Sequence, residues 1–175
     1  MLPEEVTPRS PRERKTKTPE QALAALMRLC ARAEKSAGDA RRLMHGWGVA
    51  PTDAEKVLAR LVRERFIDDR RYAEAFVREK LRLSGWGEYK LRTALQRKGI
   101  ARELIDEALG QIDRSGMADR LTERLARKAR TTRAASPYDL KTKLIRYGLS
   151  LGYDYETVLG AVAQQLNLTD PCDEF

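Results

Sequence analysis

The sequence contains little of what most disulfide-stabilised, metal-dependent or membrane proteins need. Its 175 residues include two cysteines, one histidine and only 6% aromatic residues. Cys30 and Cys172 make neither a disulfide framework nor a paired metal motif, so we expect Cys30 to be a small core residue in a reducing compartment. No stretch approaches the roughly 18 uninterrupted apolar residues of a membrane span, and the first residues lack the apolar core of a signal peptide. We therefore expect a cytoplasmic protein that does not bind membranes.

The residue patterns that carry most catalytic and cofactor chemistry are missing too. There is no phosphate-binding loop of the form GxxxxGK[ST], and the two GWG triplets, at residues 46–48 and 85–87, follow no predicted strand. His45 falls opposite Gln96 in the repeat described below, which indicates a solvated helical position rather than a general base or metal ligand. The sequence therefore predicts no enzyme, no cofactor and no metal site.

What the sequence does contain is an internal repeat. Shifting the chain along itself by 51 residues, without a gap, places Gly48 on Gly99 and apolar residues on apolar residues. A third, looser copy follows at a shift of 49, which places Gly148 opposite Gly99, and then of 50, which places Tyr155 opposite Ile105. Arrays of small similar units usually offer an extended surface to a partner. The apolar pairs of the first two copies are Ala22 with Ala73, Ala25 with Phe76, Cys30 with Leu81, Ala40 with Leu91, Met44 with Leu95, Ala54 with Ile105, Leu58 with Leu109, and Leu61 with Ile112.

Each copy is predicted to be three short helices with recognisable ends. Thr18, Pro19 and Gln21 supply an N-cap, a first-turn proline and a capping box. Gly99 follows the predicted helix Tyr89–Lys98 as a glycine able to adopt positive φ. The other expected helix starts are Ser36 with Asp39, Thr52 with Glu55, Asp68 with Asp69, and Ser136 with Pro137.

The predicted fold is all-α, with three tandem three-helix repeats in an elongated, curved array. No alternating segment of useful length suggests a strand. The expected organisation is a disordered, basic and proline-rich arm at residues 1–17, repeats at 18–67, 68–112 and 113–168, and an acidic tail at 169–175.

The net charge of +8 is concentrated toward the third repeat. A basic stripe there could meet DNA phosphates or acidic protein groups, and the alternative, a solvated face, stays open. Tyr72, Phe76 and Tyr155 occupy expected core positions, whereas Trp86 precedes a helix start and is the aromatic residue expected to be exposed. The candidate contact residues are Arg120, Arg124, Arg127, Lys128, Lys141, Lys143, Arg146 and Trp86.

The junction of the first two copies resembles the RecX family, which modulates the RecA recombinase. At this junction, residues 67–73 of this chain, family members carry in order a hydrophobic residue, two aspartates, two variable residues, an aromatic residue and an alanine. Further matches are Glu34-Lys35-Ser36 with Asp39, Arg41-Arg42-Leu43, and residues 95–100. Ala40, where the family usually has leucine, and the proline-rich arm depart from the pattern. The matching motif residues are Phe66, Ile67, Asp68, Asp69, Tyr72 and Ala73, together with Gly99.

The resemblance implies a non-enzymatic, monomeric protein that lies in the groove of a RecA filament on single-stranded DNA. Such a protein would damp ATP hydrolysis, strand exchange and co-protease activity, and so act in homologous recombination, DNA repair and the SOS response. The nearest alternative is a helical protein that binds DNA directly and without sequence specificity. The helix at Thr52–Arg65 mixes acids and bases on its polar face, which disfavours sequence-specific recognition. A scaffold for an unrelated partner would share every periodic feature.

Overall fold

The computed structural model describes residues 16–169, with side chains described to residue 166, and every regular element in this part is helical. The predicted arm therefore lies outside the described residues apart from Thr16 and Lys17, and so does the predicted tail apart from Thr169. The first repeat contains α1 (Pro19–Cys30), α2 (Ala37–Gly46) and α3 (Pro51–Arg63). The second contains α4 (Asp69–Glu79), the π-helix η1 (Lys80–Ser84), α5 (Glu88–Arg97) and α6 (Arg102–Gly110). The third contains α7 (Arg114–Thr131), α8 (Pro137–Ser150) and α9 (Tyr155–Thr169).

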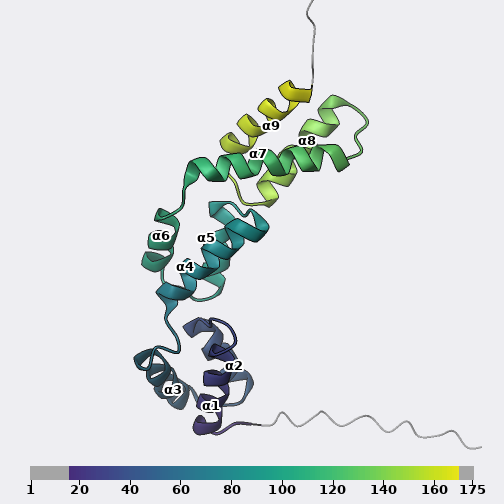
Figure 1. Cartoon of the computed structure of the whole chain (residues 1–175). Helices are drawn as coiled ribbons and strands as arrows, with labels where there is room; N and C mark the ends of the chain where they lie inside the picture. Colours follow the sequence, from purple (N-terminus) through teal and green to yellow (C-terminus); the bar gives the residue numbers. More distant parts are fainter. Residues whose placement is uncertain (1–15, 170–175) are drawn as a thin grey trace, which may run out of the picture.

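The helices form three separate bundles in series, which confirms the all-α fold and the elongated, curved array (Figure 1). Each bundle has its own apolar core, centred on Leu26 and Leu61 in the first repeat, Leu91 and Ile105 in the second, and Leu125 in the third. Helices pack against one another almost entirely within a repeat. The repeats must therefore be held in line by contacts at their ends.

Most predicted helix starts are confirmed, because the capping side chains bond as expected. Thr18 and Gln21 form a capping box, and Ser36, Asp68 and Ser136 each accept a hydrogen bond from the backbone of their own first turn. The prediction for Thr52 and Glu55 is wrong: the N-cap position is Ala50, two residues earlier, so α3 begins at Pro51 and has no side-chain cap. Proline at the first helical position has its φ preset and lacks only an N–H that would be unpaired there.

The register predicted for the third copy is wrong by one helical turn. The glycine with positive φ that ends α8 is Gly152 (φ +90°), whereas Gly148 lies inside the helix against Val158. Helix α8 has 14 residues and α5 has 10, so the N-terminal ends match at a shift of 49 and the C-terminal ends at 53. Four residues return nearly to the same side of an α-helix, so apolar periodicity does not distinguish the two registers. At the shift of 53, Val158 is the equivalent of Ile105, and Tyr155 lies outside the core.

Candidate partner-binding surface and the joints that shape it

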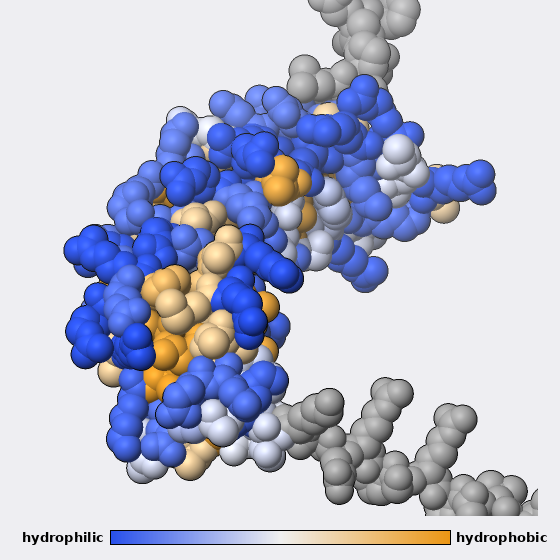
Figure 2. All heavy atoms as spheres, turned by 60° about the horizontal axis from the view of Figure 1, so that its bottom comes forward, coloured by the Kyte–Doolittle hydropathy of each residue, from blue (hydrophilic) through white to orange (hydrophobic). Residues whose placement is uncertain are grey.

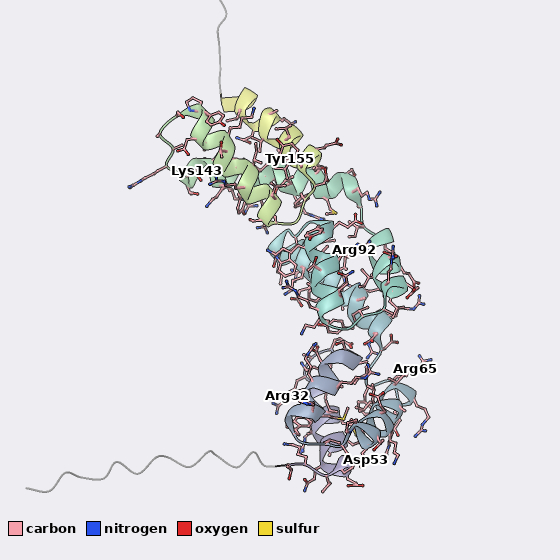
Figure 3. All side chains as sticks on the ribbon, turned by 180° about the vertical axis from the view of Figure 1, so that it is seen from behind. Arg32, Asp53, Arg65, Arg92, Lys143 and Tyr155 are labelled. Carbon is pink, nitrogen blue, oxygen red and sulfur yellow. The ribbon has the colours of Figure 1, made fainter. Side chains whose placement is uncertain are left out.

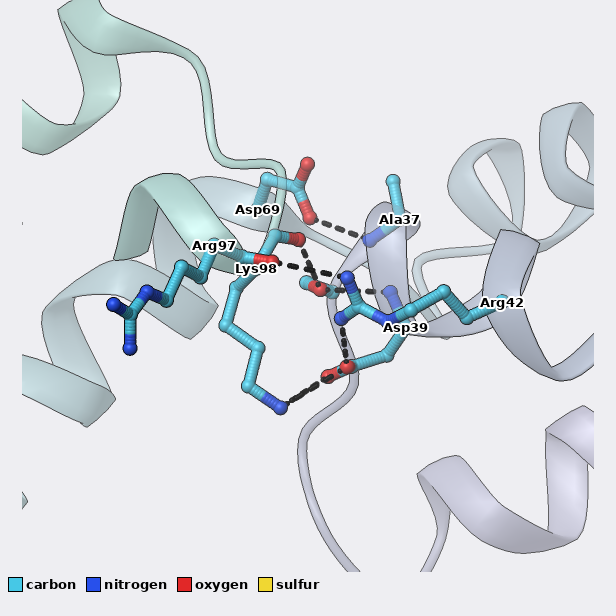
Figure 4. Close-up of polar contacts among 7 residues, drawn as sticks. Ala37, Asp39, Arg42, Asp69, Arg97 and Lys98 are labelled. Atoms are coloured by element: carbon cyan, nitrogen blue, oxygen red, sulfur yellow. Dashed lines mark hydrogen bonds and ion pairs between the residues drawn. The ribbon is translucent and has the colours of Figure 1, made fainter. Parts of the chain in front are cut away.

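The first two repeats meet where the C-terminal end of α5 faces the N-terminal end of α2 (Figure 4). The Ser36 hydroxyl donates to the Lys98 carbonyl at 3.0 Å, and the Arg42 guanidinium donates to the Arg97 carbonyl at 3.0 Å. These carbonyls have no partner within their own helix, so the neighbouring repeat satisfies them. The two helix dipoles lie head to tail, which is the favourable arrangement. This joint holds the two bundles in a fixed orientation.

The two aspartates of the family-like motif have different structural partners. Asp68 caps its own helix by accepting from the backbone N–H of Arg71 at 3.0 Å. Asp69 instead accepts from the backbone N–H of Ala37 at 2.8 Å, and so caps α2 of the preceding repeat. The motif therefore joins two repeats in addition to starting a helix.

The remaining motif residues lie on both sides of this joint. Ile67 is buried in the first core and Phe66 packs against that core. Tyr72 and Ala73 are buried in the second core. Gly99 has φ +77° and contacts Gly38 across the joint.

Charged groups at the joint have pKa values shifted in opposite directions. Burial by itself would raise the pKa of Asp39, but hydrogen bonds from Arg42 and Lys98 outweigh it and hold that pKa below its ordinary value. The pKa of Asp69 is raised, chiefly by burial, although the bond from Ala37 opposes the shift. Burial, with Asp39 nearby, also raises the pKa of Tyr72 to about 12. Asp39 forms ion pairs with Arg42 at 2.6 Å and with Lys98 at 3.1 Å, and the Lys98 pair crosses the joint.

Replacing Asp39 by asparagine should reduce the free energy of unfolding by about 1 kcal/mol at pH 7, the usual size for a partly exposed charged contact. Because the pKa of Asp39 is lowered in the folded state, its stabilising effect is present above the ordinary carboxyl pKa and is lost as the pH falls through the folded value. The difference between wild type and variant should therefore be smaller at about pH 3 than at pH 7. Urea unfolding at both pH values measures it. Asp119→Asn is the control, since Asp119 is exposed on α7 and has no ion pair within residues 16–166; an Asp39 effect equal at both pH values would contradict the prediction.

The second joint repeats the first with different side chains. The backbone N–H of Gly87, just before α5, donates to the Leu151 carbonyl at the end of α8 at 2.7 Å, and Tyr89 N–H donates to the Gly152 carbonyl at 3.1 Å. The Lys90 ammonium adds a bond to the Ser150 carbonyl at 3.0 Å. Helices α8, α5 and α2 therefore follow one another head to tail through the whole array.

The residues before α1 complete this series at the free end of α2. The Lys17 N–H donates to the Trp47 carbonyl at 2.9 Å, and Trp47 is the repeat equivalent of Lys98. Thr16 lies against Gly48, as Gly38 lies against Gly99. The Lys17 ammonium lies 4.5 Å from the centre of the Trp47 ring. Residues 16 and 17 thus take the position that a preceding repeat would occupy. They cover the C-terminal end of α2, which is the last helix end in the series α8, α5 and α2.

Four of the candidate contact residues are engaged in contacts within the protein. Arg124 donates to the Leu83 carbonyl at 3.1 Å and lies across Gly85, so it links α7 to the second repeat. Lys128 lies 5.4 Å from the ring centre of Tyr147. Lys143 bonds to the Arg133 carbonyl at 2.9 Å and to Asp139 at 2.8 Å. Trp86 is half-buried, with the ammonium of Lys90 4.8 Å and that of Lys80 5.7 Å from its ring centre, so it is less exposed than expected.

The other four candidates are exposed cations of the third repeat that form no ion pair with another helix in the described part of the chain. Arg127 makes only a 3.6 Å ion pair with Glu123, and Arg120, Lys141 and Arg146 make none within the described part of the chain. Lys141 and Lys143 are two residues apart on α8, so they point to different sides of that helix. We call Arg127, Lys141 and Arg146 the free third-repeat cations, because none of them makes an ion pair or side-chain hydrogen bond with another helix in the described residues. Arg120 is treated separately, since it borders the groove described below.

The exposure of individual side chains tests the remaining expectations for aromatic residues, His45 and Cys30. Tyr155 was expected in the core, but it is 56% exposed at the start of α9 (Figure 3), and that prediction is wrong because the register shift moves Val158 into the core position. Tyr72 is buried and Phe76 half-buried, as expected. His45 is exposed on α2, and Cys30 packs at the edge of the first core, where burial raises its pKa.

Residues 16–169 contain no group of three or more histidine, cysteine or acidic side chains arranged to hold a metal ion. None of their helices combines the length and apolarity needed to cross a bilayer. A space-filling view shows an apolar area toward the first-repeat end of the array, surrounded by hydrophilic side chains (Figure 2).

Comparisons with known proteins agree on one family. A family model described as "RecX, second three-helix domain" matches residues 68–109. "Regulatory protein RecX" of Clostridium botulinum (strain Alaska E43 / Type E3) is 32% identical over 104 residues, which cover 58% of this chain and 48% of that protein. The protein of the same name from Chlorobaculum tepidum is 35% identical over 103 residues, covering 59% and 62%. The chain spans about half the length of the first of these relatives.

Solved structures share the fold. The crystal structure of RecX from Lactobacillus salivarius superposes with a TM-score of 0.70 at 19% identity and covers 86% of this chain and 97% of that one. A second structure, "Crystal structure of regulatory protein RecX", gives 0.69 at 21% identity and covers 83% and 71%. At these identities the similarity establishes the architecture.

Proposed function

Because the chain belongs to the RecX family, we propose that it is a non-enzymatic regulator of the RecA recombinase. Its effect would be mainly inhibitory: bound in the groove of the RecA filament on single-stranded DNA, it would damp ATP hydrolysis, strand exchange and co-protease activity. The proposal places the protein in the cytoplasm as a monomer, acting in recombination, DNA repair and the SOS response.

The observation that supports this proposal is the series of similar joints. The same end-on contact, a positive-φ glycine with an adjacent carbonyl that accepts from the neighbouring segment, recurs at Gly48, Gly99 and Gly152. Repeated joints produce a regular curve, and a regularly curved strip can follow a helical groove and touch successive subunits. Several weak contacts on one strip act together, because each one raises the effective concentration of the next.

The free third-repeat cations are the surface that we propose for contact with the filament. Their side chains hold no backbone carbonyl of the protein, so they can meet DNA phosphates or acidic groups without disturbing a joint. Arg124, Lys128 and Lys143 are less suitable, since each already has a partner within the chain.

The test adds the protein to preformed filaments of RecA on single-stranded DNA and follows ATP hydrolysis. Wild type should inhibit, and the triple variant Arg127→Glu, Lys141→Glu, Arg146→Glu should need at least about tenfold more protein for the same effect and lose much of its salt dependence. The matched control reverses three exposed first-repeat arginines, Arg28, Arg32 and Arg63, which make no ion pair in the described residues. Circular dichroism checks that both variants are folded.

Two outcomes would contradict the proposal. Failure of the wild type to change ATP hydrolysis would remove the regulatory function. Equal losses in both triple variants would show that only net charge matters, and would remove the third-repeat assignment. Affinity for naked DNA, measured across a salt series, tests the alternative: inhibition only at concentrations where bare DNA is also bound would favour a direct DNA-binding protein.

A further inference from the structure

A groove of about 410 Å³ lies between the second and third repeats. Its floor is aliphatic, made of Val77, Leu81, Ala108 and Ile112. Leu81 and Ile112 pack against both the second and the third core, so the floor is shared by the two repeats. A bulky apolar side chain placed here would contact α4, α6 and α7 together.

Three arginines from three different elements border this floor. Arg78 lies on α4, Arg82 on η1 and Arg120 on α7. All three are exposed, and none makes an ion pair or side-chain hydrogen bond within the part of the chain that the structure describes. Most other arginines near a joint, such as Arg42, Arg71 and Arg124, do have such partners. Three unpaired guanidinium groups around an apolar floor form a site that complements an acidic and partly apolar ligand.

The backbone at the lip of the groove is irregular. Residues 80–84 form a π-helix, which ends at Gly85 with φ +59°. π-Helical turns are rare within helices and often occur at functional sites. Here the turn carries both Leu81 and Arg82, one to the floor and one to the rim.

We propose that this groove binds an acidic segment of a partner protein that inserts one bulky apolar side chain. A nucleic-acid strand fits less well, because the floor offers no aromatic ring for base stacking and the carboxylates of Glu74 and Asp113 also line the groove. A protein segment can use such carboxylates as acceptors for its backbone N–H groups while its own acids pair with the arginines. The occupant would contact side chains of both repeats. The proposal does not depend on the identity of the recombinase partner.

The test uses fluorescence anisotropy with the full chain and a labelled peptide, EEDFLEE, titrated to about 1 mM, the range of weak peptide binding. Two control peptides remove one property each: QQNFLQQ lacks the charges and EEDGSEE lacks the apolar side chains. Wild type should bind EEDFLEE and neither control. The variant Arg78→Glu, Arg82→Glu, Arg120→Glu should bind at least about tenfold more weakly.

Two further variants test whether binding occurs in the groove itself, and whether a change in net charge or a loss of folding could explain a weaker affinity. Gln111→Trp fills the groove from an exposed position without altering the core, so it should abolish binding while the circular dichroism spectrum stays unchanged. The first-repeat control variant, with Arg28, Arg32 and Arg63 reversed, should bind as wild type does. The proposal is overturned if EEDFLEE does not bind, if the control variant loses binding equally, or if Gln111→Trp still binds. It is also overturned if a short oligothymidylate binds more tightly than the peptide and loses affinity in the same groove variants.

Discussion

Replacing Gly38 by alanine is expected to lower the free energy of unfolding by about 2–3 kcal/mol and to uncouple the first repeat from the second. A Cβ atom at this position would lie 2.1 Å from the Lys98 carbonyl oxygen and 2.9 Å from its carbon. Both are backbone atoms, which cannot move aside as a flexible side chain can. The helix ends must therefore separate, and the bond from Ser36 to Lys98 and the bond between Ala37 and Asp69 are lost with the contact.

Gly46 provides the matched control, because it lies on the same helix with nothing within 4 Å of an added Cβ. Gly46→Ala should be neutral or stabilising by up to about 1 kcal/mol, the ordinary difference between the two residues in a helix. The two tryptophans report on different repeats, Trp47 on the first and Trp86 on the second. In a Trp86→Phe background, urea unfolding of Gly38→Ala should show Trp47 fluorescence changing at lower urea than the circular dichroism signal. Coincident transitions and a stability equal to that of Gly46→Ala would mean that the joint does not couple the repeats.

Replacing Gly152 by alanine should have a comparable or larger effect, about 3 kcal/mol, at the second joint. The residue has φ +90°, which is unfavourable for any residue with a Cβ, and the added atom would lie 2.3 Å from Lys90 Cβ and 2.6 Å from its backbone nitrogen. The bonds from Gly87 to Leu151 and from Tyr89 to Gly152 would have to break or lengthen. Chemical unfolding, followed by circular dichroism, measures the loss.

Gly160 is the control for this substitution, since it lies in α9 with nothing within 4 Å of an added Cβ. Gly160→Ala should leave stability unchanged or raise it slightly. A Gly152→Ala protein as stable as the Gly160→Ala protein would contradict the prediction.

Residue spacing along the chain was sufficient to predict features that depend on contacts within one helix. Thr18, Ser36, Asp68 and Ser136 were identified as caps from their spacing, because a capping side chain bonds to its own first turn. Residue spacing failed at Thr52, where the proline one residue earlier determined the start of α3. It failed again at Gly148, since a shift by one turn preserves the apolar face of a helix.

The candidate surface could be predicted only in part. The sequence locates the basic residues of the third repeat, but it gives no information on their partners. Arg124 bonds to a carbonyl 41 positions away, and Lys128 contacts a ring on the next helix. One available signal was missed: Gly38 is a glycine within a helix, and such a residue often marks a close approach of another backbone.

The sequence by itself determined that this protein is a chain of small helical bundles, because apolar spacing and helix capping are properties of residues three to four positions apart. It also contained the motif that marks the family. Only the tertiary structure decided how the bundles are joined and which cations remain unpaired, because those contacts link groups such as Ser36 and Lys98 that are 62 positions apart. The joint depends on the meeting of two helix ends, and no local pattern encodes the distance between them.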